Sequence, residues 1–476
     1  MKDFEILNKT FGKVKKEIYG SSCGKRAVVD FKTPGELRKI MKLAVEERGV
    51  NEKQFLQLID DYLQYSVRTG NKQFFNQLFS GFNLPAFIGE LLTTLTNTSM
   101  YTYEVAPVAS VIEKEMIALM NSYVPFSNGD GIFLTGGSNG NLLAMFSARN
   151  RVFPEGRFEG YDRTQKLVAF VNEQAHYSLD TAANLLGIGS KNVIRVKSDS
   201  KGRMDPVELE SEIKQSLHRG ENPFFVVATC ATTLMGAYDP MEEMAVICKK
   251  YDLWLHADGS FGGSILLSDT HRQLMKGVEK ADSLVWNPHK LMNIPLVCSA
   301  LLLKEKGVLE RNLTDMNTDY LYHDTDSMED LGKKSIQCGR RVDAVKLWFA
   351  WKYFGKEGYR ERIDSLMAMA EYAEKMVVEN PNLQLVVPRQ SFAICFRWVP
   401  DFKVDLNEFN LEVRERLRKN GSSMVNYGYI NDKLVIRLIT ANGNLQKKDI
   451  DEFFHNFTTE AMQLEAKNLV CGEASK

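Results

Sequence analysis

Two short strands and the residues that follow them decide the fold of this chain. The first runs through Leu253-Trp254-Leu255-His256-Ala257-Asp258 into Gly259-Ser260-Phe261-Gly262-Gly263, and the second, Ser283-Leu284-Val285-Trp286, leads into Asn287-Pro288-His289-Lys290. A carboxylate therefore ends one apolar strand and a lysine follows the next. A buried charge that lacks a partner costs on the order of 3–5 kcal/mol, so this pattern needs an explanation.

Two interpretations of the pair are open. Asp258 and Lys290 could form an internal ion pair, which would be purely structural. They could instead hold pyridoxal 5′-phosphate (PLP), with Lys290 as the Schiff base and Asp258 on the pyridinium nitrogen. The two strands alone do not separate these interpretations, so the rest of the chain has to.

The composition is typical of a globular protein from a reducing compartment. The 476 residues are 44% hydrophobic and 25% charged, and the net charge of −1 gives no reason to expect a nucleic acid or a membrane surface as partner. The seven scattered cysteines form no CxxC pair, and the seven histidines form no metal-ligand pattern. No apolar run approaches the ~18 residues of a membrane span. The N-terminus has no signal-peptide core, so we expect a cytoplasmic protein without a bound metal.

Strand, loop and helix alternate through the middle of the chain, which predicts an α/β fold with a mainly parallel sheet and helices on both faces. After about Asn380 the pattern changes to that of a small α+β domain. We expect an N-terminal helical segment at 1–85, a large domain at 86–375 and a small C-terminal domain at 376–476. The strands predicted for the sheet are Ile132–Leu134, Leu167–Val171, Val193–Val196, Phe224–Thr229, Trp254–Ala257, Leu284–Trp286 and Ser299–Leu303.

The N-terminal segment contains two clear helix signals. Apolar residues recur at spacings of three and four from Phe4 to Ile18, which predicts an amphipathic helix. Thr33-Pro34-Gly35-Glu36 is a capping box that predicts a second helix through Val45. The apolar seam of the first helix needs a surface, and we expect a partner subunit to supply it.

The loop Gly136-Gly137-Ser138-Asn139-Gly140 links the strand at Ile132–Leu134 to a predicted helix. Backbone amides at a helix N-terminus favour a phosphate, although a tight structural turn explains the loop as well when it is taken alone. The loop fits neither GxGxxG nor a Walker motif. However, this loop, Asp258 and Lys290 all lie at strand ends of one predicted sheet, where open α/β sheets bind ligands.

Other polar residues follow the same strands. His176 comes after Leu167–Val171 and could stack on a flat heteroaromatic ring, or it could be an ordinary histidine. His256 precedes Asp258 by two residues, so both point to one face of the strand, and His256 would orient the carboxylate. Thr232 and Thr233 reach the same edge of the sheet, although ordinary turn chemistry also accounts for them.

With these residues in place, the chain resembles the group II PLP-dependent amino-acid decarboxylases, and within them the acidic-substrate branch of glutamate, cysteine sulfinate and aspartate decarboxylases. The resemblance covers roughly residues 73–454. It implies fold type I of the PLP-dependent transferases, with a mainly parallel seven-stranded sheet. The motifs that carry it are His256-Ala257-Asp258, Asn287-Pro288-His289-Lys290, Thr232-Thr233-Leu234-Met235-Gly236-Ala237-Tyr238-Asp239-Pro240 and Gln337-Cys338-Gly339-Arg340-Arg341-Val342-Asp343; the branch is indicated by Phe74-Phe75-Asn76-Gln77-Leu78 and Tyr101-Thr102-Tyr103-Glu104.

The resemblance implies a role for each matching residue. Lys290 would hold PLP, Asp258 would keep its pyridine nitrogen protonated, and His176 would stack on its ring. Tyr320, on what resembles a mobile loop reaching in from the neighbouring subunit, would protonate the α-carbon after carbon dioxide leaves. Arg437 would grip the substrate α-carboxylate through its bidentate fork. The other implied cofactor contacts are Gly137, Ser138, Asn139, Thr232, Asn287 and His289.

Three positions bear on which acid is the substrate. Gln77 matches a residue that contacts the distal acid group in glutamate decarboxylases, whereas Phe79 and Tyr101 look more like the cysteine sulfinate and aspartate enzymes. A bulky Phe79 would shorten the pocket. The resemblance therefore implies decarboxylation of a small acidic L-amino acid, preferably cysteine sulfinate and also cysteate or aspartate, giving hypotaurine, taurine or β-alanine. Glutamate decarboxylation to γ-aminobutyrate is the alternative.

The family pattern is not matched everywhere, and other functions have to be weighed. Gly259-Ser260-Phe261 and Asn293 depart from the commoner residues, which leaves the fine shape of the pocket open. Tyr320 argues against an aminotransferase or an aldehyde-forming oxidative decarboxylase, and the intact Lys290 argues against a non-catalytic relative. The family also implies a homodimer with the active site at the subunit interface.

Overall fold

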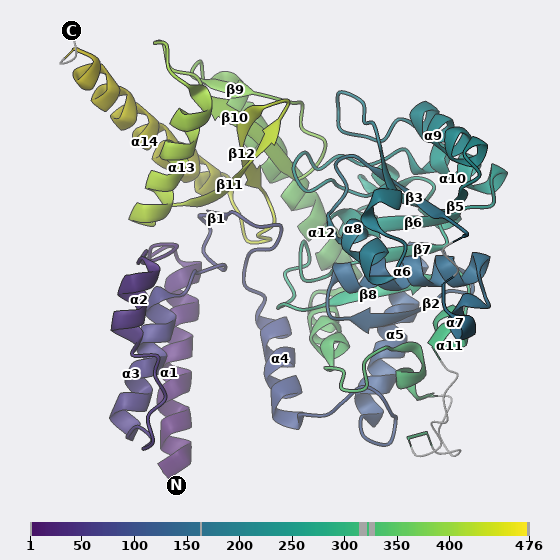
Figure 1. Cartoon of the computed structure of the whole chain (residues 1–476). Helices are drawn as coiled ribbons and strands as arrows, with labels where there is room; N and C mark the ends of the chain where they lie inside the picture. The colour runs from purple at the N-terminus through teal and green to yellow at the C-terminus, as the bar shows by residue number, and fades with distance from the viewer. Residues whose placement is uncertain (1, 162–163, 314–320, 323–328, 474–476) are drawn as a thin grey trace. The chain divides into compact units, whose positions relative to one another are not determined.

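The computed structural model describes residues 2–161, 164–313, 321–322 and 329–473 (Figure 1). The chain divides into two compact units, one made of Met1–Phe82 with Leu366–Lys476 and the other of Asn83–Ser365. Within the described ranges, no helix combines the length and the apolar character that crossing a bilayer requires.

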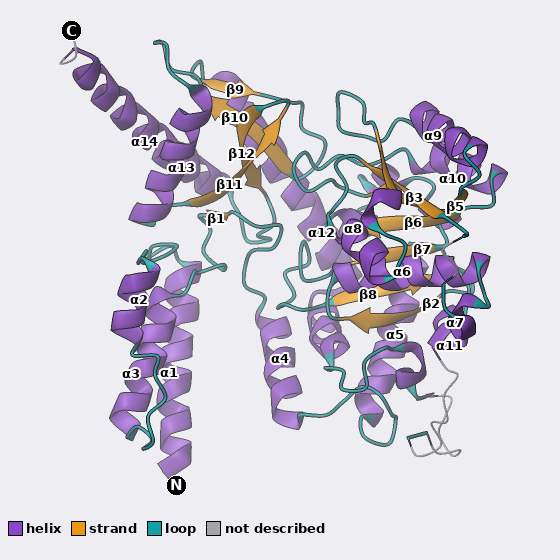
Figure 2. Cartoon of the chain, viewed as in Figure 1, coloured by secondary structure: helices purple, strands orange, loops and turns teal. Residues whose placement is uncertain are grey.

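A seven-stranded sheet forms the centre of the unit Asn83–Ser365, in the order β2-β8-β7-β6-β5-β3-β4 (Figure 2). Neighbours from β7 to β4 pair in parallel, whereas β8 is antiparallel to both β7 and β2. The predicted mainly parallel sheet is confirmed, and each of its seven predicted strands is present. The strands are β2 (Asp130–Leu134), β3 (Leu167–Asn172), β4 (Val193–Val196), β5 (Asn222–Thr229), β6 (Trp254–Gly259), β7 (Ser283–Trp286) and β8 (Ser299–Leu303).

Helix α6 (Gly137–Val152) covers the face of the sheet to which the functional residues of β6 point. Trp254 of β6 packs in one apolar cluster with Leu143 and Ala144 of α6. Alternate residues of a strand share a face, so His256 and Asp258 also point toward α6. The unit's other helices are α4 (Leu84–Thr96), α5 (Pro107–Tyr123), α7 (Gly156–Glu159), α8 (Ser178–Leu185), α9 (Pro206–His218), α10 (Met241–Lys250), α11 (Val308–Leu313) and the first part of α12 (Asp343–Glu379).

The unit made of the two ends of the chain has its own five-stranded sheet, in the order β1-β11-β12-β10-β9. β1 (Phe74–Phe75) pairs in parallel with β11 and so joins the N-terminal segment to the C-terminal α+β part. The remaining elements are β9 (Leu383–Leu385), β10 (Ala393–Trp398), β11 (Met424–Ile430), β12 (Lys433–Ile439), α13 (Leu406–Asn420) and α14 (Lys447–Glu473).

Three helices precede β1, namely α1 (Lys2–Ser22), α2 (Pro34–Met41) and α3 (Glu52–Tyr65). The capping box at Thr33 and Glu36 is present as the sequence predicts, with both of its hydrogen bonds. The prediction that this helix runs through Val45 is wrong, because it ends at Met41. Lys42 adopts the left-handed conformation at φ 44°, which stops the helical hydrogen-bond pattern.

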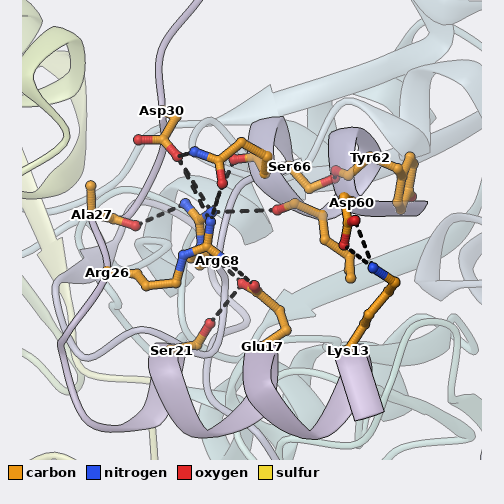
Figure 3. Close-up of polar contacts among 12 residues, drawn as sticks. Lys13, Glu17, Ser21, Arg26, Ala27, Asp30, Asp60, Tyr62, Ser66 and Arg68 are labelled. Carbon is orange, nitrogen blue, oxygen red and sulfur yellow. Dashed lines mark hydrogen bonds and ion pairs between the residues drawn. The ribbon is translucent and has the colours of Figure 1, made fainter. Parts of the chain in front are cut away.

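Arg68 holds α1 against the end of α3 (Figure 3). Its Nε donates to Glu17 of α1 at 2.9 Å, and its Nη2 donates to the carbonyl of Gln64 in α3 at 2.9 Å. Lys13 and Asp60 form a second ion pair between the same two helices. Arg68 is only 4% exposed, so its own bonds are shielded from water, whereas the Lys13–Asp60 pair is partly exposed.

Candidate active site

A cavity of about 310 Å³ opens where strands β3, β5, β6 and β7 end in the unit Asn83–Ser365. This volume is in the range of small-molecule and cofactor sites. The cavity brings together seven of the residues that the sequence predicts for the site, and it adds others that were not predicted. The predicted residues are Gly137, Ser138, His176, Asp258, Asn287, His289 and Lys290; Thr233, which the sequence placed at this edge of the sheet, also lines the cavity, and the additional residues include Asn141, Ser178, Thr229, Ala231, Ser260 and Phe261.

Asp258 is buried and remains ionised. Asn141 donates to its Oδ2 at 3.0 Å, and the backbone N–H of Ser260 donates to its Oδ1 at 3.1 Å. Burial by itself raises the pKa of Asp258, but these hydrogen bonds, with His256 and Lys290 nearby, outweigh burial and bring the pKa below its ordinary 3.8. The site therefore presents a fixed negative charge with spare acceptor capacity to whatever ring lies against it.

His256 acts on Asp258 through an intermediate residue. Its Nε2 lies 3.0 Å from Oδ1 of Asn141, whose amide nitrogen contacts Asp258. Its Nδ1 lies 2.8 Å from Oγ of Ser283. Complete burial lowers the pKa of His256 to about 4, so the ring is neutral at pH 7. The sequence places His256 and Asp258 on one face correctly, but it gives no sign of Asn141 between them.

His176 lines the cavity from the segment between β3 and α8. Its Nδ1 accepts from the backbone N–H of Ser178 at 3.2 Å and lies 2.9 Å from that residue's Oγ. Burial lowers the pKa of His176, an effect that the charge of Asp258 opposes and that of Lys290 assists. The imidazole is therefore a neutral, oriented ring beside the carboxylate, which suits stacking on a flat heteroaromatic group.

The glycine-rich loop leads into the N-terminus of α6 at the cavity wall. A Cβ added at Gly137 would overlap Oγ of Ser260 and lie 2.8 Å from Nδ2 of Asn287, so a larger residue there would displace side chains of the cavity wall. Gly136 precedes the helix with φ 129°, a conformation that favours glycine. The amides of Asn139 and Gly140 donate to the carbonyl of Gly136, so those of Gly137 and Ser138 are the ones at this helix start that could bind an anion.

Lys290 and His289 follow the end of β7. The backbone N–H of Lys290 donates to the carbonyl of Asn287 at 3.0 Å, which forms a tight turn, and the Lys290 ammonium lies 6.0 Å from the ring centre of Phe261. His289 is buried with its Nδ1 2.7 Å from the carbonyl oxygen of Cys298. Burial, assisted by the charge of Lys290, lowers the pKa of His289 to about 3. His289 is thus a neutral wall of the site.

Two predicted cofactor contacts do not line the cavity. Thr232 is fully buried, and its Oγ1 accepts from the backbone N–H of Ala237 at 3.1 Å, so it shapes the turn after β5. Thr229, Ala231 and Thr233 line the cavity instead. Asn139 faces away toward Thr135, whose Oγ1 accepts from its Nδ2 at 3.0 Å.

The other unit contains three of the predicted substrate contacts, Arg437, Gln77 and Phe79. Gln77 and Phe79 are close in the sequence, and Arg437 contacts the residue before Gln77. Arg437 of β12 is 5% exposed, and its Nη2 donates to the carbonyl of Asn76 at 2.8 Å. Burial lowers the pKa of Arg437 to about 10, which leaves the guanidinium charged at pH 7. Gln77, the next residue after Asn76, is exposed, and Phe79 is half-buried with its ring 6.5 Å from that of Phe74.

The two remaining predictions concern tyrosines. Tyr101 is half-buried in the unit Asn83–Ser365, packs edge-on against Tyr322 with ring centres 6.2 Å apart, and accepts from the backbone N–H of Gly332. Tyr320, the predicted proton donor, lies outside the residues that the structure describes.

The residues present fit PLP. The start of α6 offers amides to a phosphate, Asp258 offers a carboxylate to a ring nitrogen, and Lys290 offers an amine to an aldehyde. The Oδ1 atom of Asn287 and the Oγ1 atom of Thr229 are buried and have no hydrogen-bond partner among the described residues. Buried polar atoms without partners are rare in native proteins, and a polar ligand in the cavity would satisfy them.

Comparisons with known proteins give the same assignment. Residues 34–399 match the model of the pyridoxal-dependent decarboxylase conserved domain. The chain is 38% identical over 462 residues to cysteine sulfinic acid decarboxylase from Homo sapiens, covering 94% of each protein. It is 36% identical to the acidic amino acid decarboxylase GADL1 from Homo sapiens, covering 89% of this chain and 84% of the relative.

Solved structures show the same relationship. The crystal structure of mouse CSAD in apo form superposes with a TM-score of 0.93 at 36% identity, covering 96% of this chain and 98% of that one. Oryza sativa TDC with PLP and tryptamine, at 23% identity and a TM-score of 0.89, has the same fold. The predicted fold type I architecture is thus confirmed, and the chain belongs to the pyridoxal-dependent decarboxylase family, as a PLP-dependent amino-acid decarboxylase.

Proposed function

We propose that this enzyme removes the α-carboxyl group of a small acidic L-amino acid, preferably cysteine sulfinate, and also cysteate or aspartate. The observation that carries the proposal is the cavity where an ionised, buried Asp258 and Lys290 meet at the sheet edge. The acidic substrate is supported by the names of the relatives, which are cysteine sulfinic acid decarboxylases and acidic amino acid decarboxylases.

The residues of the cavity would have separate roles in the reaction. Bound PLP supplies an electron sink for the electron pair of the bond that breaks. Lys290 would hold the cofactor through its side-chain amine. Asp258 would keep the ring nitrogen protonated, because a desolvated carboxylate with only neutral hydrogen-bond donors strongly favours a cationic partner. His176 would stack on the cofactor ring.

The phosphate of the cofactor would be bound by the start of α6. Ser138 lines the cavity at this point, and its backbone amide lies in the first turn of the helix, ahead of the amides of Asn139 and Gly140, which donate to the carbonyl of Gly136. The helix dipole adds to the attraction for a phosphate. Asn287 Oδ1 and Thr229 Oγ1 supply further polar atoms at the cavity wall.

Four further residues would recognise the substrate. Arg437 would bind the α-carboxylate, since a buried guanidinium offers a planar fork for a carboxylate. Gln77, Phe79 and Tyr101 would set the length of the pocket, and the bulk of Phe79 favours a three-carbon acid. Tyr320 would protonate the α-carbon once carbon dioxide has left.

Glutamate decarboxylation to γ-aminobutyrate is the second candidate. Gln77 favours it, because this residue matches one that contacts the distal acid group of the substrate in glutamate decarboxylases. The chemistry at Lys290 and Asp258 would be the same, so only the substrate separates the two candidates.

We further propose a cytoplasmic homodimer, with the active site at the subunit interface and α1 packed on the partner subunit. On its own chain α1 leaves apolar side chains in water: Phe4 is 73% exposed and Leu7 46% exposed. These residues belong to the predicted apolar seam, and a second subunit would bury it.

The experiment is a competition among substrates. The purified, PLP-loaded enzyme receives cysteine sulfinate, cysteate, aspartate and glutamate together, and mass spectrometry identifies the amines. We expect hypotaurine, taurine or β-alanine as the main product. Mainly γ-aminobutyrate would support the glutamate alternative, and the absence of any amine would contradict an acidic substrate.

A variant of Phe79 tests the pocket-length argument directly. Phe79→Ala lengthens the proposed pocket, and we expect the ratio of glutamate to cysteine sulfinate turnover to rise by about tenfold or more, the scale of one to two methylene groups in an apolar pocket. Phe158→Ala removes a phenylalanine that is 70% exposed in the other unit and should leave the ratio unchanged. An unchanged ratio in Phe79→Ala would remove Phe79 from the site.

A further inference from the structure

Asn141 lies where the hydrogen bonds of the cavity meet. It is the fifth residue of α6, is 1% exposed, and uses both ends of its amide. Its Nδ2 donates to Oδ2 of Asp258 at 3.0 Å and to Oγ of Ser178 at 3.0 Å. Its Oδ1 lies 3.0 Å from Nε2 of His256. One side chain therefore contacts Asp258 directly and reaches His176 through Ser178.

The orientation of this amide follows from chemistry. An ionised carboxylate only accepts hydrogen bonds, so the NH₂ group of Asn141 must face Asp258. The amide oxygen must then face His256, and this contact is a hydrogen bond only if Nε2 of His256 carries the proton. The flipped amide would set oxygen against oxygen at Asp258 and leave a buried charge poorly solvated.

The hydrogen bonds on the other side of His256 agree with a proton on its Nε2. The indole N–H of Trp254 can only donate, and it donates to Oγ of Ser283 at 2.8 Å. The hydroxyl proton of Ser283 then points to Nδ1 of His256, 2.8 Å away, which is unprotonated in the same tautomer. Each polar group from Trp254 to Asp258 thus has a partner of the right kind.

The second branch reaches His176. Ser178 Oγ accepts from Asn141, which leaves its own proton for Nδ1 of His176 at 2.9 Å. The backbone N–H of Ser178 also donates to Nδ1, so that atom is an acceptor. The neutral ring of His176 therefore carries its proton on Nε2.

We propose that Asn141 is a positioning residue of this enzyme: its amide holds the Asp258 carboxylate in place and sets the Nε2–H tautomer of both His256 and His176. A single side chain would then couple the group that faces the ring nitrogen to the group that faces the ring plane. The inference rests on the placement of PLP proposed above, but its first test does not involve the cofactor.

That test measures thermal unfolding of the full chain, freed of cofactor, as a function of pH. Asn141→Asp puts a carboxylate against Asp258, and burial with mutual repulsion raises the pKa of the pair above the unfolded value. The folded state then binds more protons than the unfolded state, so stability falls as pH rises. The other titratable groups around the pair are His256 of β6, His176 after β3, Cys230 after β5 and Lys290 after β7.

We expect the melting temperature of Asn141→Asp to fall by about 5 °C more than that of the wild type between about pH 5 and pH 8. Asn150→Asp is the matched control: Asn150 lies in the same helix, is 6% exposed, and donates to Asn312 at 3.3 Å, away from the cavity. A pH dependence in Asn141→Asp no larger than that in Asn150→Asp would overturn the proposal, because burial of the introduced carboxylate would then account for all of it.

The second test reads the cofactor ring by ¹⁵N NMR of protein loaded with PLP labelled at the pyridine nitrogen. Asn141→Leu keeps the branched shape of the side chain and removes the donor to Asp258, so the signal should move from the protonated toward the neutral value and PLP should bind at least tenfold more weakly. Ser178→Ala interrupts only the branch to His176: the nitrogen signal should stay, and the acidic limb of the pH–rate profile should move.

Folded Asn141→Leu with wild-type nitrogen signal and PLP affinity would contradict the proposal. The two tests also separate its failure from a failure of the proposed function. If PLP does not face Asp258, the NMR signal is insensitive to Asn141 while the pH dependence of Asn141→Asp persists. If Asn141 does not contact Asp258, that pH dependence falls to the level of Asn150→Asp whatever the cofactor does.

Discussion

Gly137 shows how little space the cavity leaves at the start of α6. A methyl group there would overlap Ser260 and crowd Asn287, so we expect Gly137→Ala to lower PLP affinity about tenfold or more and to destabilise the fold by about 1–3 kcal/mol. Titration with PLP and urea unfolding measure both effects. Gly12→Ala, in α1 with open space around it, should be neutral or slightly stabilising. Wild-type PLP affinity in Gly137→Ala would mean that the phosphate lies elsewhere.

His256 gives a pH dependence with a definite sign. Its pKa falls from an ordinary 6.5 to about 4 in the folded chain, so the unfolded state binds the extra proton more readily. This contribution to stability is complete above about pH 6.5 and is lost as pH falls toward 4, a change of up to ~3 kcal/mol. His256→Gln, which keeps a donor for Asn141, should remove that part of the acid-side slope in urea unfolding. Parallel curves of unfolding free energy against pH for the wild type and His256→Gln would contradict this role of His256.

Among single residues, the sequence predicts those whose position follows from the order of the strands. Asp258, Lys290 and His176 each follow a strand, and the carboxyl ends of neighbouring parallel strands meet at one edge. Asn141 lies inside a helix, and its role depends on how α6 is rotated over β6, which local sequence does not determine. Thr232 and Thr233 are adjacent, and the turn after β5 decides which of them lines the cavity.

Among the elements, α5 and the segment before α12 are joined by a buried ion pair. Arg340 donates to both oxygens of Glu113, at 2.7 and 2.8 Å, and the two residues are 4% and 1% exposed. Breaking such a pair leaves one charge buried, so Glu113→Gln and Arg340→Met should each cost about 3–5 kcal/mol, and the double variant clearly less than their sum.

Urea unfolding of the wild type, the two single variants and the double variant measures the coupling between Glu113 and Arg340. Lys9→Ala, which removes a pair on the exposed surface of α1, is the control and should leave the unfolding midpoint unchanged. Strictly additive effects of the two buried substitutions would show that the pair is not coupled. Because Glu113 also accepts from the backbone N–H of Phe133 in β2, the pair anchors the edge of the sheet.

Strands were the most predictable elements, and their directions the least. The seven apolar runs are short and separated by helices, which is the pattern of a covered parallel sheet. Nothing local distinguishes β8, which inserts antiparallel between β7 and β2. β1 has only two residues, too few for any periodicity, yet its pairing with β11 puts both ends of the chain in one unit.

For the whole molecule, the proposed dimer depends on α1. Deleting Met1–Tyr19 should weaken the dimer, and Phe4→Ser with Leu7→Ser should do the same without shortening the chain, because both remove apolar surface that lies in water on the isolated chain. Sedimentation at decreasing protein concentration measures the effect. Lys15→Ser with Lys16→Ser changes exposed charges on the same helix and is the control. An equally tight dimer after the deletion would contradict the proposal.

The measurement that tests the assignment of the active site most directly is to identify the lysine that holds the cofactor. The PLP-loaded enzyme is reduced with borohydride and digested, and mass spectrometry locates the pyridoxyl group. We predict a single modified lysine, Lys290, and no modification in Lys290→Ala. Labelling of another lysine, such as the buried Lys346 that pairs with Glu90 and Asp343, would contradict the assignment of the site and the chemistry built on it.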